Sequence, residues 1–172
     1  MIRKKKLFSR PRKAYEKTRI TEENKLLEKY GLKNKKEVWK ALARIKYFRR
    51  RAMDIVKSSA EQQNQFFNKL KHIGLKVDSI ADVLALKVEN ILERRLPSVM
   101  ANLGLTATAR QARQFVVHRK VLINGNVVTV PSYIVPVSEE KSITLRTSLP
   151  KTNSKPKEEL SEVKQEGVVK ND

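Results

Sequence analysis

The spacing of apolar residues changes once along this chain, near residue 118, and that change constrains the fold more than any other feature. Before it, apolar residues recur every three to four positions, as in amphipathic helices. After it, two β-branched runs flank Asn124-Gly125, the dipeptide that favours a two-residue type I′ hairpin. The sequence therefore predicts an α+β fold: a mostly helical N-terminal region, then a small unit of two helices and a β-hairpin or short antiparallel sheet. Further short strands are expected at 133–137 and 142–145.

Glycine and proline mark where the helices end. Gly31, Gly74 and Gly104 each precede a leucine. A glycine just past a helix adopts the left-handed conformation, and the next apolar residue packs back on the last turn. Pro97 suits the first turn of a helix but not its interior. We therefore expect one helix to end before Pro97 and another to begin there.

Capping residues mark where the helices begin. Asn34, Ser59 and Thr108 each stand three residues before Glu or Gln, the spacing of a capping box. Thr21 and Asp78 are further candidate caps without the full box. The predicted helices cover residues 21–30, 34–57, 59–72, 78–95, 97–103 and 108–117.

Composition excludes several classes of protein. The 172 residues include 38 Lys+Arg and 18 Asp+Glu, a formal net charge of +20, with no Cys and two His. Without Cys, disulfide scaffolds, thiolate metal sites and cysteine nucleophiles are excluded. No apolar run approaches the roughly 18 residues of a membrane span, and the basic N-terminus lacks the apolar core of a signal peptide. We therefore expect a soluble, cytoplasmic protein with no membrane partner and with a polyanion as its ligand.

No constellation of residues predicts catalysis. His72 and His118 stand alone, with no His, Asp or Glu at metal-ligand spacing. The glycines are too far apart to form a phosphate-binding loop, and Glu139-Glu140 is expected to form a turn. We therefore expect a protein that is not an enzyme and that has neither a metal ion nor a cofactor.

The positive charge is concentrated in two parts of the chain. Residues 1–60 carry a net charge of +15 and residues 91–150 carry +5, whereas 61–90 and 151–172 are each neutral. Two separate clusters favour contact with nucleic-acid phosphates over a surface kept basic only for solubility. The tail from residue 151 is rich in Lys, Glu, Ser and Pro, so we expect it to be disordered.

The predicted helix over 34–57 has one apolar and one basic side. At about 100° per residue, the apolar side holds Val38, Ala41, Leu42, Ile45, Phe48, Ala52 and Val56. The opposite side holds Lys36, Lys40, Arg44, Lys46, Arg50, Arg51 and Lys57, with Tyr47 among them. A merely solvated face would carry mixed charge, yet only Asp54 interrupts this one, so we predict contacts with nucleic-acid phosphates and stacking of Tyr47 on a sugar or base. Arg49 falls on the apolar side, which the pattern does not explain.

A second basic cluster accompanies the predicted hairpin unit. It consists of Arg94, Arg95, Arg110, Arg113, His118, Arg119 and Lys120. His118, at the end of a predicted helix, is open to two interpretations: a capping group for that helix or a contact to phosphate or sugar.

These residues resemble a known family. The relevant segments are Ile91-Leu92-Glu93-Arg94-Arg95-Leu96, Leu103-Gly104-Leu105, Gln111-Ala112-Arg113-Gln114-Phe115-Val116-Val117-His118, Val121-Leu122-Ile123-Asn124-Gly125 and Pro131-Ser132-Tyr133-Ile134-Val135. In order and spacing they closely resemble the RNA-binding module named after small-subunit ribosomal protein S-four. Upstream, Tyr15-Glu16-Lys17 and the stretch from Tyr30 to Trp39 resemble the archaeal and eukaryotic branch of that ribosomal protein, and His118 with Asn124-Gly125 looks archaeal. The resemblance covers roughly residues 9–150.

The resemblance implies a structural component of the small ribosomal subunit. Such a protein binds the 5′ domain of small-subunit rRNA, nucleates assembly, lies near the messenger RNA entrance beside the S-five family protein, and influences translational accuracy. Carried over by position, the RNA-facing residues of the module are Arg94, Arg95, Thr108, Arg110, Gln111, Arg113, Gln114, His118, Lys120, Asn124, Asn126, Ser132 and Tyr133.

Two positions depart from the family pattern. Ala109 stands where a basic residue often follows the capping Ser or Thr, and Arg119 replaces the glycine of a common His-Gly-His. A left-handed Arg119 costs about 1–2 kcal/mol relative to glycine, so this turn is expected to differ or to be held by RNA. The zinc cysteines of the bacterial branch have no counterpart here.

The resulting domain hypothesis has four parts. They are a basic extended arm over 1–20, a helical rRNA-binding region over 21–90, the RNA-binding module over 91–150 and a disordered charged tail over 151–172. Two alternatives remain: the RNA-binding appendage of a modifying enzyme such as a pseudouridine synthase, and a basic architectural nucleic-acid binder. The enzyme requires a further catalytic domain with an active-site aspartate, for which no segment is long enough.

Overall fold

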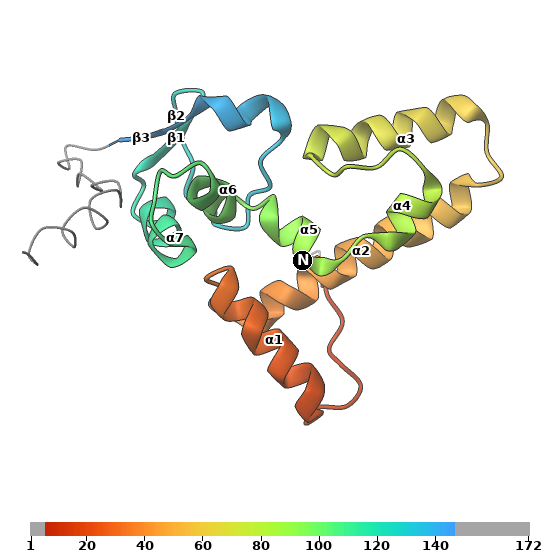
Figure 1. Ribbon diagram of the computed structural model, residues 1–172, viewed down its shortest axis with the longest axis horizontal. Coiled ribbons are helices and arrows are strands. Elements are labelled where there is room, and N and C mark those ends of the chain that lie inside the picture. Colours follow the sequence, from red (N-terminus) through yellow and green to blue (C-terminus); the bar gives the residue numbers. More distant parts are fainter. Residues whose placement is uncertain (1–5, 147–172) are drawn as a thin grey trace, which may run out of the picture.

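The computed structural model describes residues 6–146 (Figure 1). The expected disordered tail and the first residues of the basic arm lie outside this range. In chain order the elements are α1 (Lys17–Lys29), α2 (Lys35–Ile55), α3 (Ala60–Ile73), α4 (Ile80–Ala85), α5 (Val88–Glu93), α6 (Leu96–Asn102), α7 (Ala109–Val117), β1 (Val121–Ile123), β2 (Asn126–Val127), the 3-10 helix η1 (Val137–Ser142) and β3 (Ile143–Leu145). This order confirms the predicted α+β class. Within the described range, none of the helices combines the length and the apolar character needed to cross a membrane.

Helix α2 is the axis about which the other parts are arranged. It contacts α1 near one end and both α4 and α5 along its length. In Figure 1, α1 projects downward, α3 and α4 form a lobe with the far half of α2 on the right, and α6, α7 and the sheet form a lobe on the left. We call the left-hand lobe, residues 96–146, the module. Helix α5 lies between the two lobes.

The predicted glycine terminations are confirmed. Gly31, Gly74 and Gly104 have φ angles of 58°, 90° and 72°, in the left-handed region. At Gly74, the amide of Leu75 donates to the carbonyl of Leu70 at 3.1 Å, the long bond of a Schellman closure.

The predicted caps are only partly correct. Thr108 caps α7, because its hydroxyl accepts from the amide of Gln111 at 3.2 Å. Asn34 and Ser59 stand at the starts of α2 and α3 in extended conformations, but neither side chain forms a capping bond. Thr21 lies inside α1, which begins four residues earlier than expected, and its hydroxyl donates to the carbonyl of Lys17.

Helix α4 is capped by the residue next to the expected one. Ser79, rather than Asp78, forms a full capping box with Asp82. The carboxylate of Asp82 accepts from the amides of both Asp78 and Ser79, and these bonds lower its pKa.

The single helix predicted over 78–95 is wrong, because the chain breaks between α4 and α5. Leu86 is extended (ψ 133°) and buried in the core, and the amide of Lys87 donates to the side chain of Asn90 to start α5. The freed carbonyl of Leu86 accepts from the Arg49 guanidinium at 2.7 Å. This bond also explains why Arg49 lies on the apolar side of α2.

The small sheet forms around the predicted hairpin. Its strand order is β2-β1-β3, with both pairs antiparallel. Asn124 and Gly125 have φ angles of 51° and 80°, as a type I′ turn requires. Strand β2 is shorter than the run 127–130 suggested, because the amide of Tyr133 donates to the carbonyl of Val130 and turns the chain away.

Only one of the two further strands forms. Strand β3 confirms the expectation for 142–145. The strand expected over 133–137 is wrong: it reduces to one bridge between Ile134 and Arg95, because flanking prolines cannot donate to a ladder. Glu139 and Glu140 lie in η1 rather than in a simple turn.

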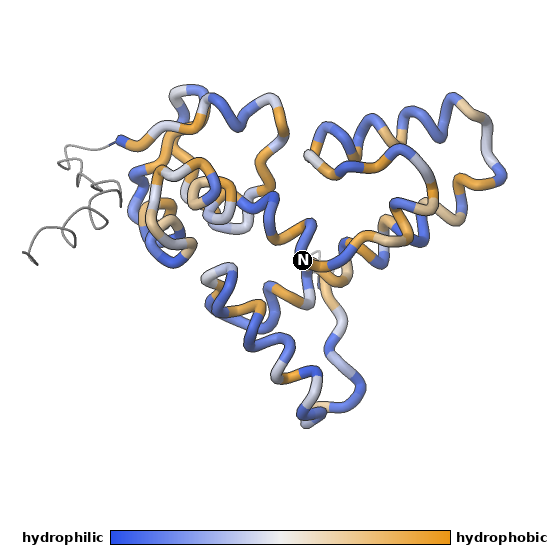
Figure 2. Tube along the Cα trace, in the orientation of Figure 1, coloured by the Kyte–Doolittle hydropathy of each residue, from blue (hydrophilic) through white to orange (hydrophobic). Residues whose placement is uncertain are grey.

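Two hydrophobic cores lie on either side of the junction between α5 and α6. In Figure 2 the apolar segments of each lobe face its own interior. The helical core joins the apolar face of α2 to α3, α4 and α5, and the module core joins α6 and α7 to the sheet. The backbone links them at one seam, where the amide of Leu96 donates to the carbonyl of Tyr133 and the amide of Val135 to that of Arg94.

The turn after α7 keeps its left-handed residue. Arg119 has a φ of 59°, and the amide of Lys120 donates to the carbonyl of Phe115 at 3.0 Å. Of the two expected alternatives, that the turn differs is therefore wrong, and that RNA holds it stays a prediction. The chain adopts the geometry that glycine favours in spite of its cost.

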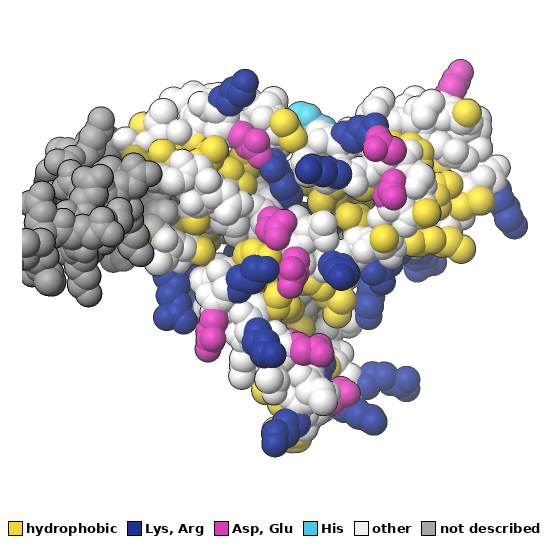
Figure 3. Space-filling model, in the orientation of Figure 1, with side chains coloured by type: hydrophobic (Ala, Val, Ile, Leu, Met, Phe, Trp, Pro, Cys, Tyr) yellow, Lys and Arg dark blue, Asp and Glu magenta, His cyan; other side chains and the backbone are white. Residues whose placement is uncertain are grey.

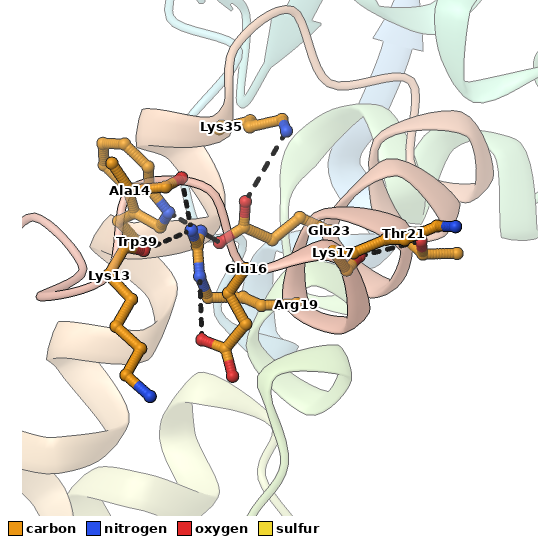
Figure 4. A network of polar contacts seen from close by, with 9 residues as sticks. All are labelled: Lys13, Ala14, Glu16, Lys17, Arg19, Thr21, Glu23, Lys35 and Trp39. Carbon is orange, nitrogen blue, oxygen red and sulfur yellow. Dashed lines mark hydrogen bonds and ion pairs between the residues drawn. The ribbon is translucent and has the colours of Figure 1, made fainter.

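A buried polar network fixes α1 and the arm before it to α2 (Figure 4). The Glu23 side chain, only 8% exposed, accepts from the Arg19 guanidinium and from the Trp39 indole, both at 2.8 Å. Arg19 also donates to the carbonyls of Lys13 and Ala14, at 2.9 and 3.0 Å. The part of the arm around Lys13 and Ala14 is thereby tied through Arg19 and Glu23 to α2.

Candidate RNA interface

The basic side of α2 is exposed, as its periodicity predicts. Lys40, Arg44 and Tyr47 follow one another at spacings of four and three, so they form a stripe along one edge of the helix. All three are exposed, and 63% of the surface of Tyr47 is accessible. Neither Lys40 nor Arg44 forms an ion pair with a described residue.

This stripe forms one side of a groove of about 620 Å³. We call it the α2–module groove. It is lined by Leu7, Glu37, Lys40, Ala41, Ala43, Arg44, Tyr47, Ile91, Leu92, Arg95, Arg113, Pro131, Ser132 and Ile134. Residues of the two separate basic clusters therefore meet in one place: three from α2, Arg95 from the segment between α5 and α6, and Arg113 from the module. Ser132, which the resemblance predicts, lines the same groove.

Glu37 holds the two sides of the groove together. Its carboxylate accepts from Arg95 Nη2 at 2.6 Å and from Arg113 Nη1 and Nη2 at 3.0 and 2.8 Å. Burial disfavours its ionised form, but the hydrogen bonds from Arg113 and Arg95 outweigh that effect and lower its pKa. Two guanidinium groups against one carboxylate leave this cluster with a net positive charge.

The RNA contact expected of Arg95 stays a prediction, and in the structure its side chain has an internal role. Its side chain is 7% exposed, and besides Glu37 it contacts the carbonyl of Pro131 at 3.3 Å. Its Nη1 atom is buried without a hydrogen-bond partner among the described residues. Arg95 therefore contributes positive charge to the groove although it is buried in its lining. Arg113, at 22% side-chain exposure, is partly accessible.

Arg94 likewise has an internal role, and its expected contact with RNA stays a prediction. Its guanidinium donates to the carbonyls of Ile73 and Val135, at 2.8 and 2.7 Å, and pairs with Glu140. It thereby fixes the end of α3 to the module. A Cβ added at Gly74 would lie 2.4 Å from Cζ of this guanidinium, so the guanidinium would have to move and give up hydrogen bonds.

The remaining predicted residues are mostly exposed. Lys120 and Tyr133 are half-buried: Lys120 Nζ lies 5.7 Å from the centre of the Phe115 ring, and Tyr133 donates to Glu139 at 2.7 Å. That hydrogen bond raises the pKa of Tyr133. The exposed ones are Lys36, Lys46, Arg50, Arg51, Thr108, Arg110, Gln111, Gln114, His118, Asn124, Asn126 and Ser132.

Not all of them converge on the groove. Thr108 and Arg110 line a separate cavity of about 540 Å³ between α1 and the module, together with Glu28 and Glu93. His118, Asn124 and Asn126 line neither cavity.

Charge is not uniform over the surface. On the face drawn in Figure 3, Lys and Arg alternate with Asp and Glu over α1 and the centre of the molecule, while hydrophobic side chains gather over the lobe of α2, α3 and α4. Mixed charge is typical of a solvated surface. The stripe of α2 that borders the groove differs, because it carries cations and an aromatic ring without acidic neighbours other than Glu37 in the groove lining.

Sequence reasoning missed two groups that shape the groove. Glu37 was assigned to a capping box with Asn34, yet its side chain contacts arginines far along the chain. Ile134 supplies apolar floor from the segment expected to be a strand. The one available signal was that Glu37 is an isolated acid within a basic stretch. Among residues 6–146, no cluster of His, Asp and Glu has the arrangement of a metal site.

Comparison with known proteins places the chain in a family. The S4 domain model matches residues 94–141, within the region predicted to be the module. The small ribosomal subunit protein uS4 of Methanococcus aeolicus is 39% identical over 166 residues, covering 92% of this chain and 94% of that protein. The uS4 protein of Halobacterium salinarum is 42% identical over 141 residues, covering 80% and 83%. That of Methanococcus maripaludis is 38% identical over 155 residues, covering 86% and 87%. The predicted archaeal-type resemblance and the prediction of a non-enzymatic protein are thus confirmed, and the chain belongs to the uS4 family of small ribosomal subunit proteins.

Proposed function

We propose that this protein is an rRNA-binding structural component of the small ribosomal subunit in the cytoplasm. The observation that supports this most directly is the α2–module groove. There, two cationic clusters far apart in the sequence meet and keep a net positive charge after their internal ion pairs are counted. Double-stranded and folded RNA is recognised mostly through backbone phosphates and shape, which such a surface suits.

The finer assignment follows the resemblance. The ligand is the 5′ domain of small-subunit rRNA, and binding it early nucleates assembly. In the subunit the protein lies near the messenger RNA entrance, contacts the S-five family protein and contributes to translational accuracy. The helical region expected over 21–90 binds phosphates with the exposed face of α2. The RNA-binding region expected over 91–150, which contains the module, sets the register on RNA through its loops and the start of α7.

The test compares RNA with DNA under varied salt. Affinity for the 5′ domain of small-subunit rRNA is measured against a DNA duplex of equal length, between low and high salt. We expect tighter binding to the rRNA and a steep negative slope of log affinity against log salt, because several phosphates are neutralised. Equal affinity for the DNA duplex would contradict the proposal and favour a general architectural nucleic-acid binder.

A further inference from the structure

The α2–module groove contains more than a phosphate-binding surface needs. Part of its accessible lining is apolar: Leu7 is exposed, and Ala43, Pro131 and Ile134 are half-buried. Phosphates gain nothing from apolar contacts, and a duplex keeps its bases stacked inside, away from such a surface. The apolar lining therefore requires a ligand that offers an uncharged, flat surface as well as a charge.

Tyr47 supplies a flat surface at the same place. It lines the groove with 63% of its surface accessible, and no described polar group hydrogen-bonds its ring or hydroxyl. The ring of Phe48, which is buried in the helical core, lies 5.9 Å away at a tilt of 56°. A tyrosine exposed in this way is suited to stack on a base that has left its helix.

Cationic side chains lie beside Tyr47 in the groove, where they can bind backbone phosphates. Arg44 and Lys40 stand one and two turns before Tyr47 on the same stripe, and Arg113 faces them from the module. The groove volume of about 620 Å³ lies in the usual range of ligand pockets, roughly 300–1,000 Å³. The groove thus combines the volume of a ligand pocket, positive charge and an exposed aromatic ring.

From this juxtaposition we infer that the groove binds a single unpaired nucleotide extruded from the RNA helix. Its base stacks on Tyr47 against the apolar lining, and Arg44, Lys40 and Arg113 hold the flanking phosphates. The inference rests on the proposed function and deepens it: the protein recognises a bulged position rather than duplex RNA alone.

The experiment uses the full chain and two RNA probes. One is an RNA duplex with a single bulged 2-aminopurine nucleotide, and the other is the same duplex with that nucleotide paired to uridine. We expect the wild-type protein to prefer the bulged duplex and to quench its 2-aminopurine fluorescence on binding, because the base stacks on an aromatic ring. Tyr47→Ala should weaken binding to the bulged duplex by about 5- to 140-fold and change binding to the paired duplex by less than about twofold.

Two variants serve as matched controls. Tyr47→Phe keeps the ring and should retain both the preference and the quenching. Tyr15→Ala removes a tyrosine that is 94% exposed on the arm and outside the groove, so it should leave the preference unchanged. Equal loss on both duplexes in Tyr47→Ala, or no loss, would overturn the inference while leaving RNA binding intact. Failure of the wild-type protein to bind either duplex while it binds the 5′ domain of small-subunit rRNA would also overturn the inference, whereas failure to bind that rRNA would overturn the proposed function.

Discussion

Replacing Glu37 with Gln tests whether the two lobes are held together by charge. The carboxylate bonds two guanidinium groups, and its side chain is 17% exposed against 7% for Arg95 and 22% for Arg113. Removing one partner from a fully buried ion pair costs about 3–5 kcal/mol, because the remaining charge stays buried and unpaired. Partial exposure here places the loss near the lower limit, about 3 kcal/mol. That corresponds to roughly a hundredfold change in the equilibrium between folded and unfolded protein.

The free energy of unfolding is measured by urea denaturation followed by circular dichroism at neutral pH. Glu22→Gln is the matched control, since Glu22 is exposed on α1 and forms no ion pair with a described residue. Its effect should stay within about 0.5 kcal/mol. If the two variants unfold at the same urea concentration, the reasoning that the cluster stabilises the fold is refuted.

The same network predicts a dependence on pH. The pKa of Glu37 in the folded protein lies below its ordinary value of 4.5. Its ionised form therefore stabilises the fold above that pH, and the contribution is lost as pH falls through the folded-state pKa. The wild-type protein should lose stability over this acidic range more steeply than Glu37→Gln, which has no group to protonate there. Parallel pH profiles of the two proteins would show that Glu37 does not contribute.

Three further substitutions address the turns and the basic face. Gly74→Ala should destabilise by more than about 2 kcal/mol in urea unfolding, because it adds a clash with the Arg94 guanidinium to the left-handed backbone cost. Gly104→Ala, which meets no atom within 4 Å, should cost only about 1–2 kcal/mol, and equal effects would disprove the close packing. Arg119→Gly should raise the free energy of unfolding by about 1 kcal/mol, and a loss of stability would show that the arginine side chain supports the turn. Replacing Arg50 and Arg51 with Ala should weaken rRNA binding and flatten the salt slope by about two, whereas an unchanged slope would show that this part of the face is only solvated.

Local chemistry explains which parts of the fold could be predicted from sequence. Gly31, Gly74 and the Asn124-Gly125 turn depend on conformations that only a few residue types adopt readily, so sequence reveals them. The break at Leu86 depends instead on its burial and on a bond from Arg49, contacts that form only when α4 packs on α2. Tertiary packing therefore ends the helix at a point where the sequence pattern predicted that it would continue.

The candidate RNA interface, too, could be predicted from the sequence only in part. The exposed stripe of α2 follows from periodicity, because its apolar face must pack inward. Arg95 and Arg113 had the residue type of RNA ligands, but their partner Glu37 lies 58 and 76 residues away in the chain. A single sequence gives no sign of pairing over such a separation. The residue types thus indicated phosphate binding, but only the fold showed which arginine side chains are accessible.

The separation of the two cores has a consequence for the order of folding during synthesis. The buried residues of the helical core all lie between Tyr30 and Leu92, and those of the module core between Leu96 and Ile143. Domains form as units in the order in which they are synthesised, so the helical core can pack before the module has been made. The module must wait for β3, its last strand, which pairs with the central strand β1. Glu37 and the end of α3 are then already in place when the arginines that bind them arrive, and docking of the second lobe completes a surface prepared by the first.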